Sequence, residues 1–258
     1  MELGLKGKKV LITGGSKGIG LACAQAFIAE GARVAIVSRS QANLDAAKKV
    51  LKDCYCIAAD LIDPVAAAKV IEKTESEFGA IDILVNSAGA AKRTNADDLT
   101  PEAWRAAMDA KYFTYINVID PLVKRMAARG AGVIVNIIGA GGKLASPIHL
   151  PGGAANAALM LATAGLANAY AAKGVRVVGI NPGLTNTGRV SEGLKADAKR
   201  EGISEDEALA RAKKKLPLGR LAEPGEIADI AVFAASVRGQ FLTGANISAD
   251  GVSTPTVV

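Results

Sequence analysis

Residues 9–20, with the sequence KVLITGGSKGIG, decide the fold. Lys9–Thr13 is a short run of apolar and β-branched residues, which is typical of a buried strand, and glycines follow it directly. A helical pattern then covers residues 19–30 and stops at Gly31. Glycines at such a turn let backbone amides approach an anion, and the helix N-terminus adds a partial positive charge. Because a second strand follows within about 30 residues, the pattern predicts a nucleotide-phosphate site here.

The alternation of apolar runs and helical patterns continues through most of the chain. It predicts further strands at residues 33–37, 54–59, 81–85, 132–138 and 175–180, and helices at 44–51, 64–78, 102–128 and 154–172. Strands that are apolar throughout, each followed by a helix, indicate a parallel sheet with both faces covered. We therefore expect an α/β fold of three layers, α/β/α, with a doubly wound, Rossmann-like sheet that binds ligands outside the carboxyl ends of its strands.

The alternation stops after Gly183. Residues 185–216 are polar and charged and contain three glycines, and they predict a helical excursion that covers the site. A last helix is expected at Pro224–Ala235 and a last strand at residues 245–249. Because no linker, repeat or low-complexity stretch interrupts the chain, we expect residues 1–258 to form a single domain.

Composition excludes several classes of protein. The chain has 258 residues, of which half are hydrophobic and 22% are charged, so it is not a disordered, collagen-like or coiled-coil protein. A net charge of +6 with only 4% aromatic residues favours an ordinary basic surface over a nucleic-acid surface. One histidine and scattered acids make no convincing metal site. Three cysteines, an odd number, fit reduced thiols in a cytoplasmic protein.

One uncharged stretch, residues 144–172, is long enough to cross a bilayer. It contains Pro147, Pro151, Asn156 and Asn168, and its other residues are mostly alanine and glycine. The chain offers no second segment of this kind. We therefore expect a helix that is buried in the core or between subunits, and no membrane partner.

The end of the second strand distinguishes two cofactors. An acidic side chain there would accept a hydrogen bond from a ribose 2′-hydroxyl and repel a 2′-phosphate. This chain has Ser38-Arg39 instead, and Arg39 can form a bidentate pair with a phosphate, with Lys17 expected nearby. The residues therefore favour NADP(H) over NAD(H). The alternative is that Arg39 is an ordinary surface residue and that either cofactor binds.

With these motifs the chain resembles the single-domain short-chain dehydrogenases/reductases over nearly its whole length. Residues 13–20 match the family's TGxxxGxG loop, Asp60-Leu61 its adenine-contacting position, residues 86–89 (NSAG) its NNAG motif, and Asn181-Pro182-Gly183 its PG turn. Gly219-Arg220, residues 224–228, Thr243-Gly244 and Asp250-Gly251 match its C-terminal signature. The resemblance implies cofactor contacts at Gly14, Ser16, Lys17, Ile19, Arg39, Asp60, Leu61, Asn86, Ala88, Gly89, Pro182, Gly183 and Thr185, and we add Ser38 from the strand end.

The catalytic positions implied by the resemblance hold other residues. The family uses a tyrosine as proton donor, a lysine four residues later, a serine that orients the substrate, and an asparagine in the long helix. Spacing to the PG turn places Asn156 at the lysine position, and counting back from it places Gly152 at the tyrosine position and Gly139 at the serine position. In the long helix, Lys111 takes the asparagine position, fifteen residues before Met126. We therefore expect the usual mechanism not to operate.

Relative to the family pattern, lysine and asparagine have exchanged places between two helices. We expect the Lys111 ammonium to reach the site of the missing lysine, with Asn156 as its hydrogen-bond partner and a lowered pKa that suits acid–base chemistry. The alternative is that Lys111 extends to solvent. His149, the only histidine, precedes Gly152 by three residues and is a candidate replacement proton donor; the alternative is a loop residue without chemistry.

These observations predict an NADP(H)-dependent oxidoreductase with a non-standard active site that transfers hydride to or from a small carbonyl, alcohol or imine. Its catalytic candidates are Lys111, His149 and Asn156. The alternative is a catalytically inactive NADP(H)-binding sensor or scaffold, since the usual catalytic set is absent. Nucleic-acid binding is the least favoured class. The resemblance also implies a homodimer or homotetramer.

Overall fold

The computed structural model describes residues 1–89 and 93–256. A seven-stranded sheet of entirely parallel pairs forms its centre, in the order β3-β2-β1-β4-β5-β6-β7. The strands are β1 (Lys9–Thr13), β2 (Arg33–Ser38), β3 (Tyr55–Ala58), β4 (Ile83–Asn86), β5 (Gly132–Ile137), β6 (Val175–Pro182) and β7 (Asn246–Ala249). The strand order reverses between β1 and β4, where a doubly wound sheet opens a crevice for its ligand. The predicted fold class is thereby confirmed.

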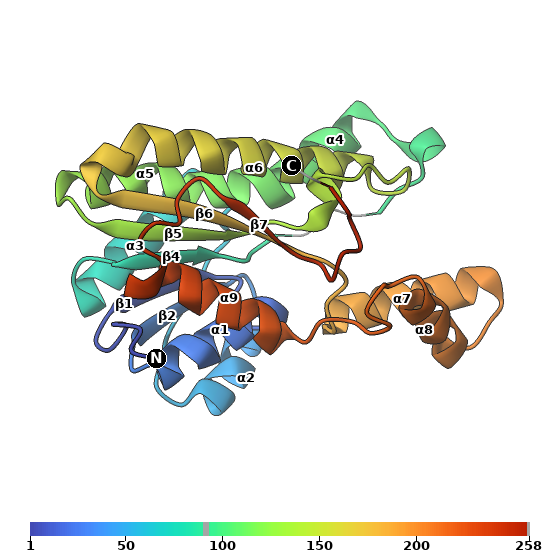
Figure 1. The fold of residues 1–258 in the computed structure, drawn as a ribbon, viewed down its shortest axis with the longest axis horizontal. Coiled ribbons are helices and arrows are strands. Elements are labelled where there is room, and N and C mark those ends of the chain that lie inside the picture. The colour runs from blue at the N-terminus through green and yellow to red at the C-terminus, as the bar shows by residue number, and fades with distance from the viewer. Residues whose placement is uncertain (90–92, 257–258) are drawn as a thin grey trace.

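Helices cover both faces of the sheet (Figure 1). One face packs on α1 (Gly18–Ala29), α2 (Gln41–Leu51) and α9 (Pro224–Ala235), and the other on α3 (Pro64–Phe78), α5 (Thr114–Ala128) and α6 (Leu150–Tyr170). Successive strand residues serve opposite layers: Val10 and Ile12 belong to the first, and Leu11 between them belongs to the second. Both layers are therefore anchored on the same short apolar strands, which explains why these strands lack polar alternation.

The predicted helix over residues 102–128 is wrong as a continuous α-helix. It consists of α4 (Pro101–Met108), a π-helical turn (Asp109–Phe113) and α5. The Thr114 hydroxyl donates to the Asp109 carbonyl over 2.8 Å, and the backbone of Gly89 packs against Ala110. π-Helical turns within α-helices are frequent at functional sites. This one carries Lys111 at the carboxyl-end edge of the sheet.

The long apolar helix begins earlier than predicted, at Leu150 and not at residue 154, because a proline is well tolerated in a first helical turn and Pro151 occupies it. By length and composition this helix could cross a membrane. Its buried residues, which include Ala155, Leu159 and Ala167, instead pack within the protein core. In this structure α6 is therefore a helix of the core.

The polar excursion forms α7 (Gly188–Glu201) and α8 (Glu205–Lys214), which stand beside the sheet layers (Figure 1). Gly188 and Gly193 lie inside α7 and do not interrupt it, whereas Gly202 ends it with a left-handed φ of +67°. Thr185, between β6 and α7, pairs with Ala222 in an isolated parallel bridge. This bridge holds the chain in place just before the first turn of α7. The excursion thus starts at the edge where the ligand crevice is expected.

Candidate active site

Four buried polar side chains hold the carboxyl ends of the central strands together. Strand register places Thr13 beside Asn86, and Asn86 beside Asn136. The Thr13 hydroxyl donates to Asn86 Oδ1 (3.2 Å), Asn86 Nδ2 donates to Asn136 Oδ1 (3.0 Å), and Asn136 Nδ2 donates to Thr163 Oγ1 on α6 (3.0 Å). All four side chains are almost completely buried. The Asn86 side chain, which the resemblance assigns to the cofactor, therefore binds neighbouring strands.

The turn after β1 has the shape of a phosphate cradle. Gly14 has φ +67°, and a Cβ on it would lie 2.8 Å from Ala88 Cα; a Cβ on Gly20 would overlap the Gly14 carbonyl oxygen. Only glycine fits at these two positions. The N-terminus of α1 has no side-chain cap at Lys17 and no acidic residue in its first turn. Its free N–H groups are therefore available to an anion, which fits a dinucleotide pyrophosphate.

Two exposed cations, Lys17 and Arg39, lie beside this turn. In the described part of the chain neither forms an ion pair or hydrogen bond with its side chain. Ser38, at the end of β2, accepts a hydrogen bond from the Ser40 amide at 3.4 Å, and Ser40 caps α2. The strand end therefore presents a hydroxyl and a free guanidinium, which suit a ribose phosphate.

The remaining predicted cofactor contacts lie along the same edge. Asp60 is exposed and Leu61 is buried. The other predicted positions are Ser16 (buried), Ile19 (half-buried), Ala88 (amide donating to Thr13 Oγ1), Gly89 (φ +98°), Pro182 (buried at the end of β6), Gly183 (amide donating to the Ala249 carbonyl) and Thr185 (buried). The structure thus brings them to the carboxyl ends of the strands and the loops that follow.

Lys111 is buried and does not extend to solvent. Its Nζ donates to the Tyr115 hydroxyl (2.9 Å) and to the Ile137 carbonyl (3.0 Å), and the same hydroxyl donates to that carbonyl (2.5 Å). The predicted hydrogen bond from Lys111 to Asn156 is wrong, because Tyr115, one helical turn on, and the end of β5 lie closer to the ammonium. Burial and, secondarily, the charge of Arg189 lower the pKa of Lys111 from 10.5 to about 7.

Asn156 and His149 lie together beside two glycines. Asn156 Nδ2 is 3.2 Å from the position that a Cβ would take on Gly139, and a Cβ on Gly141 would lie 3.6 Å from His149 Cδ2. Asn156 Oδ1 and His149 Nδ1 are buried without a hydrogen-bond partner among the residues that the structure describes. Burial, followed by the charges of Arg93, Arg189 and Lys111, lowers the pKa of His149. The three catalytic candidates are therefore close enough to interact, although Lys111 and Asn156 are not paired.

Two side chains at this edge were missed by sequence reasoning. The Tyr115 hydroxyl accepts a hydrogen bond from the Lys111 ammonium. Tyr115 is itself fully buried, so it does not contact a substrate directly. Its spacing of four residues from Lys111 was the available signal. Arg93 follows β4 in a loop without periodicity, and no sequence pattern marks it. Lys143, which follows β5, donates to Ser248 Oγ at 3.2 Å.

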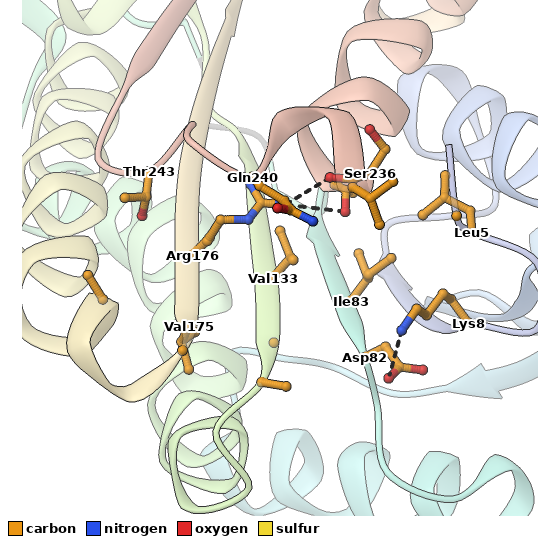
Figure 2. Close-up of a pocket in the computed structure, with 17 residues that line it drawn as sticks. Leu5, Lys8, Asp82, Ile83, Val133, Val175, Arg176, Ser236, Gln240 and Thr243 are labelled. Carbon is orange, nitrogen blue, oxygen red and sulfur yellow. Dashed lines mark hydrogen bonds and ion pairs between the residues drawn. The ribbon is translucent and has the colours of Figure 1, made fainter. Parts of the chain in front are cut away.

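A cavity lies away from this edge of the sheet. It has a volume of about 510 Å³ and lies at the amino ends of β4, β5 and β6, opposite the site described above (Figure 2). Its Lys8 pairs with Asp82 at 4.0 Å, and its Arg176 donates to the carbonyls at the end of α9, including Ala234 at 2.8 Å. These charged groups already have partners, so the cavity shows no chemistry of its own. A smaller cavity of about 180 Å³ adjoins Gly183, and its lining includes three leucines and two isoleucines.

Comparison with known proteins agrees with this geometry. A family model described as short chain dehydrogenase matches residues 8–197. An acetoacetyl-CoA reductase of Shinella zoogloeoides is 37% identical over 93% of this chain and 96% of its own, and a 3alpha-hydroxysteroid dehydrogenase of Mediterraneibacter gnavus is 32% identical over 98% and 99%. A crystal structure of L-sorbose reductase from Gluconobacter frateurii, complexed with NADPH and L-sorbose, matches the whole of both chains with a TM-score of 0.94 and 31% identity.

Proposed function

The chain belongs to the short-chain dehydrogenase family and is an oxidoreductase of that type, and we propose that it reduces a small carbonyl compound with NADPH through a non-standard active site. The observation that carries this proposal is the phosphate cradle at Gly14 and Gly20 beside the exposed cations Lys17 and Arg39, in a fold shared with an enzyme whose structure contains NADPH. The reverse oxidation would use the same site.

NADPH fits the residues that are present. The uncapped α1 N-terminus suits the pyrophosphate, and Arg39 with Lys17 suits the additional 2′-phosphate, where no carboxylate at the strand end opposes it. The preference for NADP(H) over NAD(H) agrees with the NADPH complex among the structural neighbours. When bound, NADPH supplies the hydride. The chain's own residues then have to orient the carbonyl and supply a proton.

We assign the proton to Lys111, His149 or a water that they hold. The Lys111 ammonium has three donors, of which two are used by Tyr115 and the Ile137 carbonyl, so one remains for the substrate or a water. A pKa of about 7 suits proton transfer near neutrality. Asn156 Oδ1 is free to accept a hydrogen bond from the substrate or a bridging water. Tyr115 acts as a positioning residue for Lys111.

A catalytically inactive, NADP(H)-binding sensor or scaffold is the second candidate. One observation favours it: the positions at which the family carries its tyrosine and serine hold Gly152 and Gly139, which have no proton to give and no side chain to orient an oxygen. In that case the cofactor would act by stabilising one conformation of the protein.

A carbonyl and imine screen separates the two candidates. The folded protein is incubated with NADPH and each compound, and loss of NADPH absorbance is followed for wild type, Lys111→Met and His149→Phe. The reductase proposal expects turnover by wild type and a loss of about 100-fold or more in at least one variant, the usual contribution of a general acid. NADPH binding without turnover of any compound would favour the sensor.

Association into a homodimer or homotetramer also stays a proposal. Leu161 on α6 is 76% exposed and Phe113, at the junction with α5, is 42% exposed, so this helical layer offers apolar side chains to another copy. Light scattering on the purified protein would give the oligomeric state directly. The expectations of a cytoplasmic location and of no nucleic-acid partner remain predictions.

A further inference from the structure

Four basic side chains from separate segments meet at the carboxyl-end edge of the sheet. Arg93 follows β4, Lys111 lies in the π-helical turn, His149 precedes α6, and Arg189 lies in the first turn of α7. The segments that carry Arg93 and His149 are in contact, because the Thr94 amide donates to the Ile148 carbonyl over 3.1 Å. We call Arg93, Lys111, His149 and Arg189 the cation cluster.

The members of the cation cluster repel one another. After burial, the charges of Arg93, Arg189 and Lys111 lower the pKa of His149, the charge of Arg189 lowers that of Lys111, and the charge of Arg93 lowers that of Arg189. Every charge that acts on His149 is therefore positive. Such an arrangement costs folding free energy unless an anion compensates it.

Protein carboxylates do not supply that anion. In the described ranges, the carboxylate that pairs with a member of the cluster is Asp197, 3.8 Å from Arg93, and it pairs more closely with Arg200 at 2.8 Å. Among the described residues, Arg189 has a single long hydrogen bond, to the Gly89 carbonyl at 3.4 Å. The cation cluster thus has up to four positive groups, and its one paired carboxylate, Asp197, is shared with Arg200.

Two buried polar atoms without partners lie in the same place. Among the residues that the structure describes, His149 Nδ1 and Asn156 Oδ1 have no hydrogen-bond partner, and a Cβ on Gly139 or Gly141 would lie within 4 Å of these two side chains. A buried polar atom without a partner is costly and usually marks a place where a ligand or water belongs. The site therefore combines uncompensated positive charge with unsatisfied hydrogen-bonding capacity.

We propose that the cation cluster binds an oxyanion on the substrate, so that the substrate class is a small carbonyl compound carrying a carboxylate or a phosphate. This inference rests on the proposed function, because it places the substrate in the same site. Arg93 and Arg189 would bind the oxyanion, since guanidinium groups pair with carboxylate and phosphate in bidentate geometry. Lys111 and His149 would remain beside the carbonyl.

The cofactor's own phosphates are the competing explanation for the cluster. The glycine turn and the uncapped α1 N-terminus already provide for the pyrophosphate, and Thr187, two residues before Arg189, lies 3.2 Å from where a Cβ on Gly18 would be. Arg189 could therefore face either group, whereas Arg93 extends toward Asp197 on α7. The test must separate substrate binding from NADPH binding.

Matched carbonyl pairs test the inference. Steady-state reduction is measured with NADPH for levulinate against methyl levulinate, and for dihydroxyacetone phosphate against dihydroxyacetone. Wild type should prefer the anionic member of at least one pair by about 10-fold or more in kcat/KM, the size of a charge-assisted hydrogen bond. The pair that shows the preference identifies the oxyanion as carboxylate or phosphate.

Arg93→Gln and Arg189→Gln should each reduce that preference by about 10-fold. Arg105→Gln is the matched control, because Arg105 lies on the exposed surface of α4 and pairs only with Glu102 at 3.5 Å. If neutral carbonyls are reduced as well as their anionic partners, or if both glutamine variants keep the preference, the inference is wrong. It is equally wrong if the variants weaken NADPH binding and leave the preference intact.

A binding measurement separates this inference from the proposed function. Levulinate and dihydroxyacetone phosphate are titrated calorimetrically into wild type and both glutamine variants, with and without NADP⁺. If the protein neither binds NADPH nor reduces any carbonyl, the proposed function fails, yet oxyanion binding lost in Arg93→Gln still supports the cation cluster. Oxyanion binding that is absent from wild type, or equal in the variants, overturns it.

Discussion

Replacing Lys111 by methionine should stabilise the protein while lowering its activity. Lys111 is 8% exposed, and its pKa falls from 10.5 to about 7 on folding. A shift of that size corresponds to about 5 kcal/mol at about 1.36 kcal/mol per pKa unit, of which about 4 kcal/mol acts at pH 7. Methionine fills a similar volume but loses hydrogen bonds worth about 2 kcal/mol. We therefore expect Lys111→Met to be about 2 kcal/mol more stable at pH 7.

The pH dependence of this difference is a sharper test than its size at one pH. Below pH 7 the lysine is protonated in both states, so the full penalty on the folded state is present. Between pH 7 and 10.5 the unfolded chain binds more protons than the folded one, so the stability of wild type rises relative to Lys111→Met. From pH 7 to 9 this gain should be about 2 kcal/mol.

Urea unfolding at fixed protein concentration gives both free energies. The exposed Lys73 on α3 provides the control, and Lys73→Met is measured over the same pH range. If the wild type and Lys111→Met curves run parallel from pH 7 to 9, Lys111 is not a depressed, buried amine, and its assignment as a proton donor loses its physical basis.

Three further substitutions test separate parts of the site. Arg39→Ser should weaken NADPH binding by about 10- to 100-fold and leave NADH binding nearly unchanged, because it removes a charge-assisted phosphate contact; equal losses for both cofactors by calorimetry would contradict this. His149→Phe should lower kcat by about 100-fold if the imidazole donates the proton, and full activity would exclude that role. Thr163→Val removes the acceptor 3.0 Å from Asn136 Nδ2, and we expect a loss of about 1–3 kcal/mol in urea unfolding; an unchanged midpoint would show that the buried network contributes little.

The fold was predictable because its signals are local. Lys9–Thr13 forms β1 as predicted, because a short apolar and β-branched run of this length is typical of a buried strand. The π-helical turn was not predictable, because it depends on Gly89 and Ala110 meeting across the sheet edge. The start of α6 was missed for a different reason: Pro151 suggests a loop in the sequence but is well accommodated in a first helical turn.

The sequence predicted which residues lie at the site better than it predicted the hydrogen bonds between them. Spacing located Lys111, His149 and Asn156, which the structure brings to one edge. Spacing could not show that Lys111 bonds to Tyr115, because side-chain direction is set by packing between α5 and β5. Arg93 was missed because its loop has no periodicity, so only tertiary structure places it beside α7. Motif analysis does not detect a cluster of charges that comes from four segments far apart in the sequence.

The most direct test of the account is a calorimetric titration of the folded wild-type protein with NADPH and with NADH. The turn at Gly14 and Gly20, with Lys17 and Arg39 beside it, should give binding heat with NADPH and an affinity at least about 10-fold higher than for NADH. Folding is checked on the same sample by circular dichroism. Absence of binding heat with both nucleotides, on folded protein, would contradict the central claim that this edge of the sheet binds a phosphorylated dinucleotide.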